Sequence, residues 1–207
     1  MENKLSYREY QSSDAPYLAD IIRKTWEYDR FCPPDTAKRM AHLYLTNCLC
    51  GQSYTQVALK DNLPVGIIMA RAKKQKPAGN YKLSRIRAEL SMLCHKEDRA
   101  VLKIFGGINS VDKELLKSRN IDYDGEIVFF ALNENCRGTG IGKTLFTKAV
   151  GYLKEVQAKN FYLYTDSSCN YGFYEHQGMK RCGEKTCHVP VGIDNTMYFY
   201  LYEYQIA

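Results

Sequence analysis

The pattern of apolar and polar positions predicts a chain that alternates strands with helices. Strands are expected at residues 5–11, 54–60, 65–71, 127–132, 161–165, 179–188 and 196–204. One helix is expected after the cap residues and proline of Ser12 to Pro16, and a second between Pro34 and Gly51. Apolar positions 141, 145, 149, 153 and 156 recur at the spacing of a third helix.

A basic, glycine-spaced turn joins the strand at 127–132 to that third helix. The strand is almost wholly apolar, which is typical of a strand buried on both faces. The turn reads Arg137-Gly-Thr-Gly-Ile-Gly142, and its glycines let the backbone approach a ligand closely. Because the start of a helix leaves its first N–H groups unpaired, this junction predicts a phosphate site.

Two common phosphate motifs do not fit the spacing of this turn. A P-loop requires a glycine five residues before Gly142-Lys143-Thr144, and Arg137 stands there. The dinucleotide fingerprint requires G-x-G-x-x-G, whereas the glycines lie at positions 138, 140 and 142. The turn therefore belongs to another class of phosphate site.

A strand, four spacer residues, Arg-Gly-x-Gly-x-Gly and an amphipathic helix together resemble the acetyl-CoA pyrophosphate loop of the GCN5-related N-acetyltransferase (GNAT) superfamily. A second segment resembles the same superfamily, with Phe173-Tyr174 followed three residues later by Gly178 and an apolar residue. One departure is Ser167, where the superfamily often has an asparagine, and Asn170 lies closer to the tyrosine.

The resemblance implies an α/β (α+β) fold with a mixed, mostly antiparallel central sheet flanked by helices. We expect residues 1–207 to form a single domain. Because the superfamily joins its third and fourth strands by little more than a turn, residues 72–123 are expected to form a helical insertion. One helical stripe comprises Leu83, Ile86, Leu90 and Leu93, a second comprises Val101, Leu102 and Phe105, and Ser110 is expected to begin a further helix. The sequence leaves open whether this insertion is a lid, a wall of the pocket, a packing element or a dimer element.

By resemblance, the glycine turn binds the pyrophosphate of acetyl-CoA, and the pantetheine arm lies along the strand edge before it. An amide near Leu132 would face the thioester oxygen. The residues expected to bind the cofactor are Phe130, Ala131, Leu132, Arg137, Gly138, Thr139, Gly140, Ile141, Gly142, Lys143, Thr144 and Asn170.

Two residues are the candidates for proton transfer. By resemblance, Tyr174 lies near the cofactor sulfur, and a phenol with a pKa of about 10 stays protonated as a donor must. The alternative for Tyr174 is a core tyrosine whose hydroxyl caps a backbone group. Glu126 heads the fourth strand and is a candidate general base; an edge glutamate in a turn, with ordered water as the base, is the alternative.

Composition and charge restrict the other function classes. The net charge is +6, and residues 71–120 hold thirteen Lys or Arg against five Asp or Glu, a local excess of +8. Only Tyr81 and Phe105 are aromatic there, too few to stack bases, so a nucleic-acid partner is not expected. Eight cysteines without C-x-x-C spacing indicate reduced thiols and predict no metal site. Without a signal peptide or membrane span, a cytoplasmic protein is expected.

The sequence thus predicts an N-acetyltransferase that moves an acetyl group directly from acetyl-CoA to a primary amine. The acceptor is expected to be a small molecule or a protein amino group. Whether the chain forms a homodimer is left open by the sequence. The alternative is a catalytically silent module that binds or senses acyl-CoA.

Overall fold

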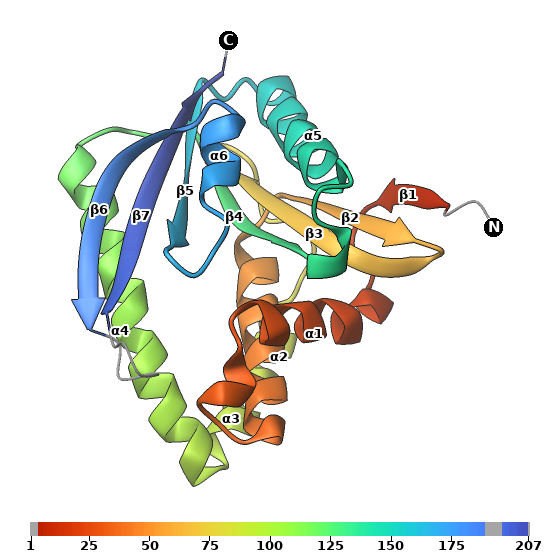
Figure 1. Ribbon diagram of the computed structural model, residues 1–207, viewed down its shortest axis with the longest axis vertical. Coiled ribbons are helices and arrows are strands. Elements are labelled where there is room, and N and C mark those ends of the chain that lie inside the picture. The colour runs from red at the N-terminus through yellow and green to blue at the C-terminus, as the bar shows by residue number, and fades with distance from the viewer. Residues whose placement is uncertain (1–3, 189–195, 207) are drawn as a thin grey trace.

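The computed structural model describes residues 4–188 and 196–206, with only the backbone described at residues 100, 103–109 and 188. The described residues form one seven-stranded sheet in the order β1-β2-β3-β4-β5-β7-β6 (Figure 1). The strands are β1 (Leu5–Arg8), β2 (Tyr54–Lys60), β3 (Leu63–Ala72), β4 (Gly125–Leu132), β5 (Asn160–Asp166), β6 (Lys180–His188) and β7 (Thr196–Gln205). All neighbours are antiparallel except β4 and β5, which confirms the predicted mixed sheet.

The helices of the described chain lie on both faces of this sheet. They are α1 (Ala15–Thr25), α2 (Pro34–Gly51), α3 (Lys82–Leu93), α4 (Lys96–Arg119), α5 (Ile141–Glu155) and the single turn α6 (Gly172–His176). The first strand ends at Arg8 and not at Gln11 as predicted. Asp14 accounts for the early end, because it accepts hydrogen bonds from the Arg8 guanidinium and from the Gln11 amide, which turns the chain away from the sheet.

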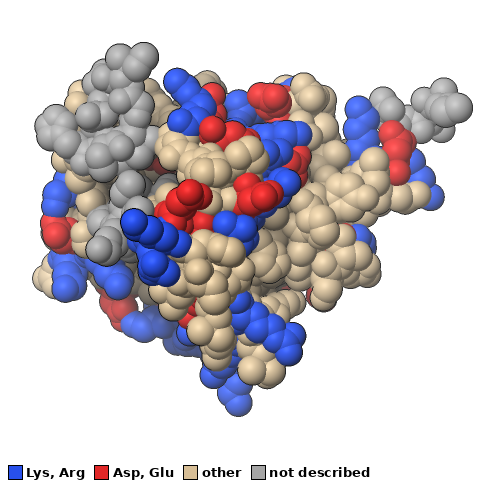
Figure 2. All heavy atoms as spheres, turned by 90° about the horizontal axis from the view of Figure 1, so that it is seen from below, with Lys and Arg blue, Asp and Glu red and all other residues tan. Residues whose placement is uncertain are grey.

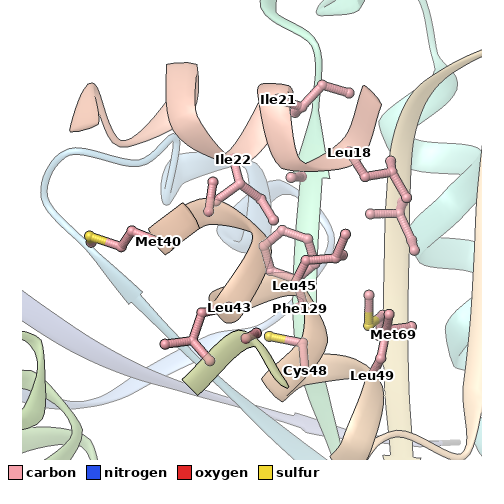
Figure 3. Close-up of a cluster of buried hydrophobic side chains, with 14 of the residues drawn as sticks. Leu18, Ile21, Ile22, Met40, Leu43, Leu45, Cys48, Leu49, Met69 and Phe129 are labelled. Carbon is pink, nitrogen blue, oxygen red and sulfur yellow. The ribbon is translucent and has the colours of Figure 1, made fainter. Parts of the chain in front are cut away.

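Strand β3 shows how the sequence divides the core into two layers. Ile67 and Met69 pack with α1 and α2, whereas Ile68 and Ala70 pack with α5 on the opposite face. Successive side chains of a strand point to opposite faces, so a continuous apolar run serves both layers. Figure 3 shows the first layer, where Met69 and Phe129 from the sheet meet leucines and isoleucines from α1 and α2 and Met40 from α2.

The insertion between β3 and β4 is helical, as predicted, but its packing differs from the prediction. The stripe of Leu83, Ile86, Leu90 and Leu93 is 66%, 45%, 55% and 50% exposed, and α3 instead buries Ala88 and Met92. Helical spacing identifies an apolar stripe without identifying what covers it, which explains the error. The prediction of a new helix at Ser110 is also wrong, since α4 runs unbroken from Lys96 to Arg119. The predicted contact of Phe105 lies outside the described side chains.

Helix α4 is fixed to α2 through a buried carboxylate, Asp98, which is 0% exposed. Its Oδ1 accepts a hydrogen bond of 2.6 Å from the Thr36 hydroxyl, and its Oδ2 accepts one of 2.6 Å from Arg39 Nε. The bond from Arg39, assisted by that from Thr36, lowers the pKa of Asp98. Farther along, α4 packs on β6 and β7 (Figure 1). Val111 and Leu115 of α4 are buried in one cluster with Leu201 of β7.

Replacement of Asp98 by asparagine is expected to lower the free energy of unfolding at pH 7 by about 2 kcal/mol, because charge-assisted bonds to Arg39 and Thr36 are lost. A carboxyl whose pKa is lowered on folding stabilises the protein above its unfolded pKa, and this stabilisation is lost as the pH falls. The difference between variant and wild type should therefore hold down to about pH 4 and shrink as the pH falls further. Urea unfolding followed by circular dichroism measures the free energy of unfolding of both proteins. Asp35→Asn on exposed α2 surface is the control, and an equal loss in both variants would contradict the role of Asp98.

Some of the basic residues of the insertion are paired with acidic groups. Figure 2 shows both signs of charge interspersed on the face seen from below. Ion pairs join Lys73 to Asp122, Arg85 to Glu89 and Arg119 to Glu203, whereas Asp98 and Glu114 of the insertion pair with Arg39 and Lys185 outside it. In the described part of the chain, no helix has the length and apolar character needed to cross a membrane.

Candidate active site

Strands β4 and β5 separate soon after they meet. Their parallel pairing is limited to Gly125 with Phe161 and Glu126 with Tyr162. On its other edge β4 stays paired with β3 as far as Leu132. The stretch of β4 after Glu126 therefore has one backbone edge that β5 does not use, and an extended ligand can add to such an edge.

The predicted phosphate turn follows directly after β4 and has the backbone geometry of an anion cradle. Gly138 and Gly140 have φ values of +75° and +83°, which side-chain-bearing residues rarely adopt. A Cβ at either position would meet no atom within 4 Å, so both glycines border open space. The first backbone bond of α5 runs from the Thr144 N–H to the Gly140 carbonyl, and the amides just before it have no intrahelical acceptor.

A pocket of about 270 Å³ extends from this turn to α6 and the end of α1; we call it the small pocket. It is lined by Thr25, Trp26, Phe130, Ala131, Leu132, Arg137, Gly138, Gly140, Gly142, Lys143, Cys169, Asn170, Phe173 and Tyr174. Ten of the sequence-predicted site residues are thus brought together. Among the described residues, the Arg137 and Lys143 side chains form no ion pair with a carboxylate, which leaves both cations available to a phosphate.

Three predicted cofactor residues have side chains that are used elsewhere. Thr139 donates its hydroxyl to the Cys136 carbonyl at 2.7 Å, and Thr144 donates its hydroxyl to the Gly140 carbonyl at 3.2 Å. Ile141 is buried in the core beneath α5. Any contribution of these three to an anion site would come from their backbone amides.

Tyr174 lies at the junction of α6 with the sheet, and its ring packs against aromatic neighbours. The ring centroids of Phe173, Tyr202 and Phe130 lie 5.5, 5.9 and 6.5 Å away. Burial, with smaller contributions from Cys169 and Asp166, raises the pKa of the Tyr174 phenol, so the hydroxyl stays protonated. No described residue hydrogen-bonds this hydroxyl, so it does not cap a backbone group within the described chain.

Glu126 is placed differently from the other predicted site residues. Its carboxylate pairs with the Arg71 guanidinium on β3, and its side chain is only 14% exposed. Glu126 does not line the small pocket. Its role as a general base stays a prediction.

A larger cavity of about 590 Å³, which we call the large cleft, adjoins the small pocket. The two share six lining residues: Thr25, Trp26, Phe130, Arg137, Cys169 and Tyr174. The large cleft also reaches Tyr28, Tyr44, Asp112, Tyr164 and Asp166. Sequence reasoning missed Trp26, which directly follows α1, and Asp112 on α4 as lining residues, because no motif distinguishes either from a packing or surface residue.

The cysteine near the junction of the two cavities is a poor nucleophile. Burial, followed by the nearby Asp166 charge, raises the pKa of Cys169 to about 12, and its thiol donates to the Asp166 carboxylate at 3.8 Å. A thiol of this kind stays protonated near neutral pH, which disfavours an acyl-cysteine route. Within the described residues no three His, Cys, Asp or Glu side chains are grouped for metal binding.

The site thus combines a splayed β4–β5 pair with a glycine turn at the start of α5. The sequence profile of the acetyltransferase (GNAT) family matches residues 103–179, the segment that contains the splayed strand, the turn, α5 and α6. The family profile thus covers the part of the chain that carries the candidate site, and the likeness of the rest is one of fold. No curated protein sequence matches the chain.

Solved structures share this fold at low sequence identity. A ribosomal-protein-alanine N-acetyltransferase from Brucella melitensis is 14% identical with a TM-score of 0.56, over 97% of this chain and 99% of that chain. PH1933 from Pyrococcus horikoshii is 16% identical with a TM-score of 0.58, over 98% of each chain. A Salmonella typhimurium structure described as a putative acetyltransferase contains its cofactor acetyl-CoA and is 11% identical with a TM-score of 0.57, over 99% of this chain and 95% of that chain. At these identities the likeness is one of fold.

Proposed function

We propose that this protein is an acetyl-CoA-dependent N-acetyltransferase that moves the acetyl group directly to a primary amine. The observation that carries the proposal is the small pocket, because it joins a phosphate turn, an unused strand edge and a protonated phenol in one cavity. The adjoining large cleft supplies a separate space for the acceptor. A ternary complex, with both substrates bound before transfer, follows from two cavities that meet.

The residues of the small pocket would hold acetyl-CoA in a defined direction. Amides at the start of α5, with Arg137 and Lys143, would bind the diphosphate, and the free edge of β4 would pair with the pantetheine amides. The open space beside Gly138 and Gly140 fits such a ligand. The thioester would then lie near Tyr174, where the two cavities join.

Transfer requires two proton movements at this junction. The amine nitrogen forms a bond to the acetyl carbon as the carbon–sulfur bond breaks, and a backbone amide near Leu132 would stabilise the oxyanion. The Tyr174 hydroxyl would give its proton to the departing thiolate. Glu126 or an ordered water would take the proton that the amine loses.

The test is release of free thiol on mixing the protein with acetyl-CoA and a panel of amines, with isothermal calorimetry of coenzyme A binding alongside. Thiol release that depends on the amine, and an acetylated amine identified by mass spectrometry, is the expected result. Binding of coenzyme A without transfer to any amine would favour the silent acyl-CoA module. Absence of binding would overturn the proposal as a whole.

A further inference from the structure

The large cleft has walls that suit a cationic, aliphatic ligand. The Trp26 ring lies 5.4 Å from the Tyr44 ring and 6.0 Å from the Phe129 ring, and Tyr44 lies 5.7 Å from Phe129. These three rings come from the end of α1, from α2 and from β4, and all line the cleft. Aromatic faces pack against alkyl chains and attract ammonium groups through their negative π-clouds.

The charged residues of the cleft carry more negative than positive charge, although the whole protein has a net charge of +6. They are Lys24, Glu27, Asp112, Glu134, Arg137 and Asp166. Lys24 pairs with Asp20 at 2.7 Å, and Asp166 accepts the Ser168 amide at 2.8 Å. Arg137 belongs to the phosphate end, since it also lines the small pocket.

Asp112 differs from these residues because one of its carboxylate oxygens is buried and unsatisfied within the described part of the chain. It lies on α4 of the insertion, and its Oδ1 is buried without a hydrogen-bond partner among the described residues. A buried carboxylate oxygen without a partner is costly, and such a group is usually satisfied by a donor or a cation. The cleft that Asp112 lines is the place from which a cation could reach it.

The groups around Asp112 also favour the binding of a cation. Burial, followed by the negative charges of Asp166 and Glu126, raises the pKa of Asp112 to about 7. Burial raises the pKa values of the Tyr44 and Tyr164 phenols, and the charge of Asp112 adds to this, so both phenols stay neutral. An ammonium beside Asp112 would offset the repulsion and favour its ionised form.

The position of Asp112 separates it from the reacting centre. It lines the large cleft only, whereas Tyr174, Phe130 and Arg137 line both cavities. An acceptor whose amine reaches the shared end would therefore extend its other end along the aromatic walls toward Asp112.

We propose that the acceptor is an aliphatic diamine, whose reacting amine lies at the junction of the two cavities and whose second, cationic amine is bound by Asp112 between the aromatic walls. This inference rests on the proposed acetyl transfer and specifies its substrate class. Asp112 is a specificity residue in this assignment and takes no part in the proton transfers.

The test uses two acceptors, cadaverine and pentylamine, which differ by one amine. The measured quantity is the ratio of kcat/KM for cadaverine to kcat/KM for pentylamine at pH 8. The wild type is expected to prefer the diamine by roughly tenfold or more, as a charge pair in a partly desolvated site would give. Asp112→Asn is expected to bring the ratio toward one, mainly through the KM for cadaverine, with the KM for acetyl-CoA unchanged. Asp35→Asn, an exposed carboxylate on α2, is the control and should keep the wild-type ratio.

The pH dependence gives a second measurement on the same pair of acceptors. Below about pH 7 Asp112 takes up a proton and loses its charge, so the preference for cadaverine should decline in the wild type and stay flat in Asp112→Asn. Equal ratios in wild type and variant, or a loss of kcat with unchanged KM for cadaverine, would overturn the inference while leaving acetyl transfer intact. Failure of both amines to react, although other amines are acetylated, would also overturn it. Failure of every amine would instead overturn the proposed function.

Discussion

Tyr174→Phe is expected to lower kcat by about a hundredfold or more, because the variant lacks the proton that the departing thiolate needs. Affinity for coenzyme A should change little, since the ring keeps its contacts with Phe173, Phe130 and Tyr202. Burial raises the pKa of the Tyr174 phenol, so wild-type activity should show no loss on the alkaline side from this group near neutral pH. Steady-state thiol release and calorimetry with coenzyme A measure the two quantities separately.

Tyr171→Phe is the matched control for this prediction. Tyr171 is three residues before Tyr174, and its ring lies 5.1 Å from Tyr200 with the Arg181 guanidinium 5.1 Å from it. It lines neither cavity, so its hydroxyl should be dispensable for turnover. Similar rates for Tyr174→Phe and wild type would exclude Tyr174 as the proton donor. A large loss of coenzyme A affinity in Tyr174→Phe would instead show that Tyr174 acts in cofactor binding.

Gly140→Val is expected to weaken coenzyme A binding by about a hundredfold or more. Valine is strained at a φ of +83°, and its side chain would occupy the open space into which the turn would receive the diphosphate. Loss of two charge-assisted amide bonds would account for a change of this size. Calorimetry with coenzyme A gives the dissociation constant, and thermal unfolding reports whether the turn has damaged the fold.

Gly151→Val is the matched control, because it makes the same substitution within α5 without strain at a positive φ and without filling the space beside the turn. Gly151 lies within α5, has no positive φ, and a Cβ there would meet no atom within 4 Å. Its variant should bind coenzyme A like the wild type. If Gly140→Val also binds coenzyme A normally, the diphosphate is not held at this turn, and the proposed orientation of the thioester fails with it.

The sequence predicted the parts of the fold and candidate site that depend on local patterns. The turn from Arg137 to Gly142 was recognisable because glycines, a cation and a helix start are adjacent in the chain. Asp112 could not be found in this way, since its neighbours in the cleft come from α1, α2, β4 and β5. The stripe from Leu83 to Leu93 was predicted, but its exposure was not, because which face of α3 is buried is decided by contacts with α2 that are distant in sequence.

The buried link between Asp98 and α2 has a consequence for the evolution of substrate choice. Asp98 and Asp112 are on one continuous helix, about 21 Å apart at 1.5 Å per residue. Because α4 is one continuous helix that is fixed at Asp98, a small change of its tilt there displaces Asp112 by a larger distance. Substitutions around Thr36 and Arg39 could therefore retune which amines are accepted, although neither residue touches the ligand.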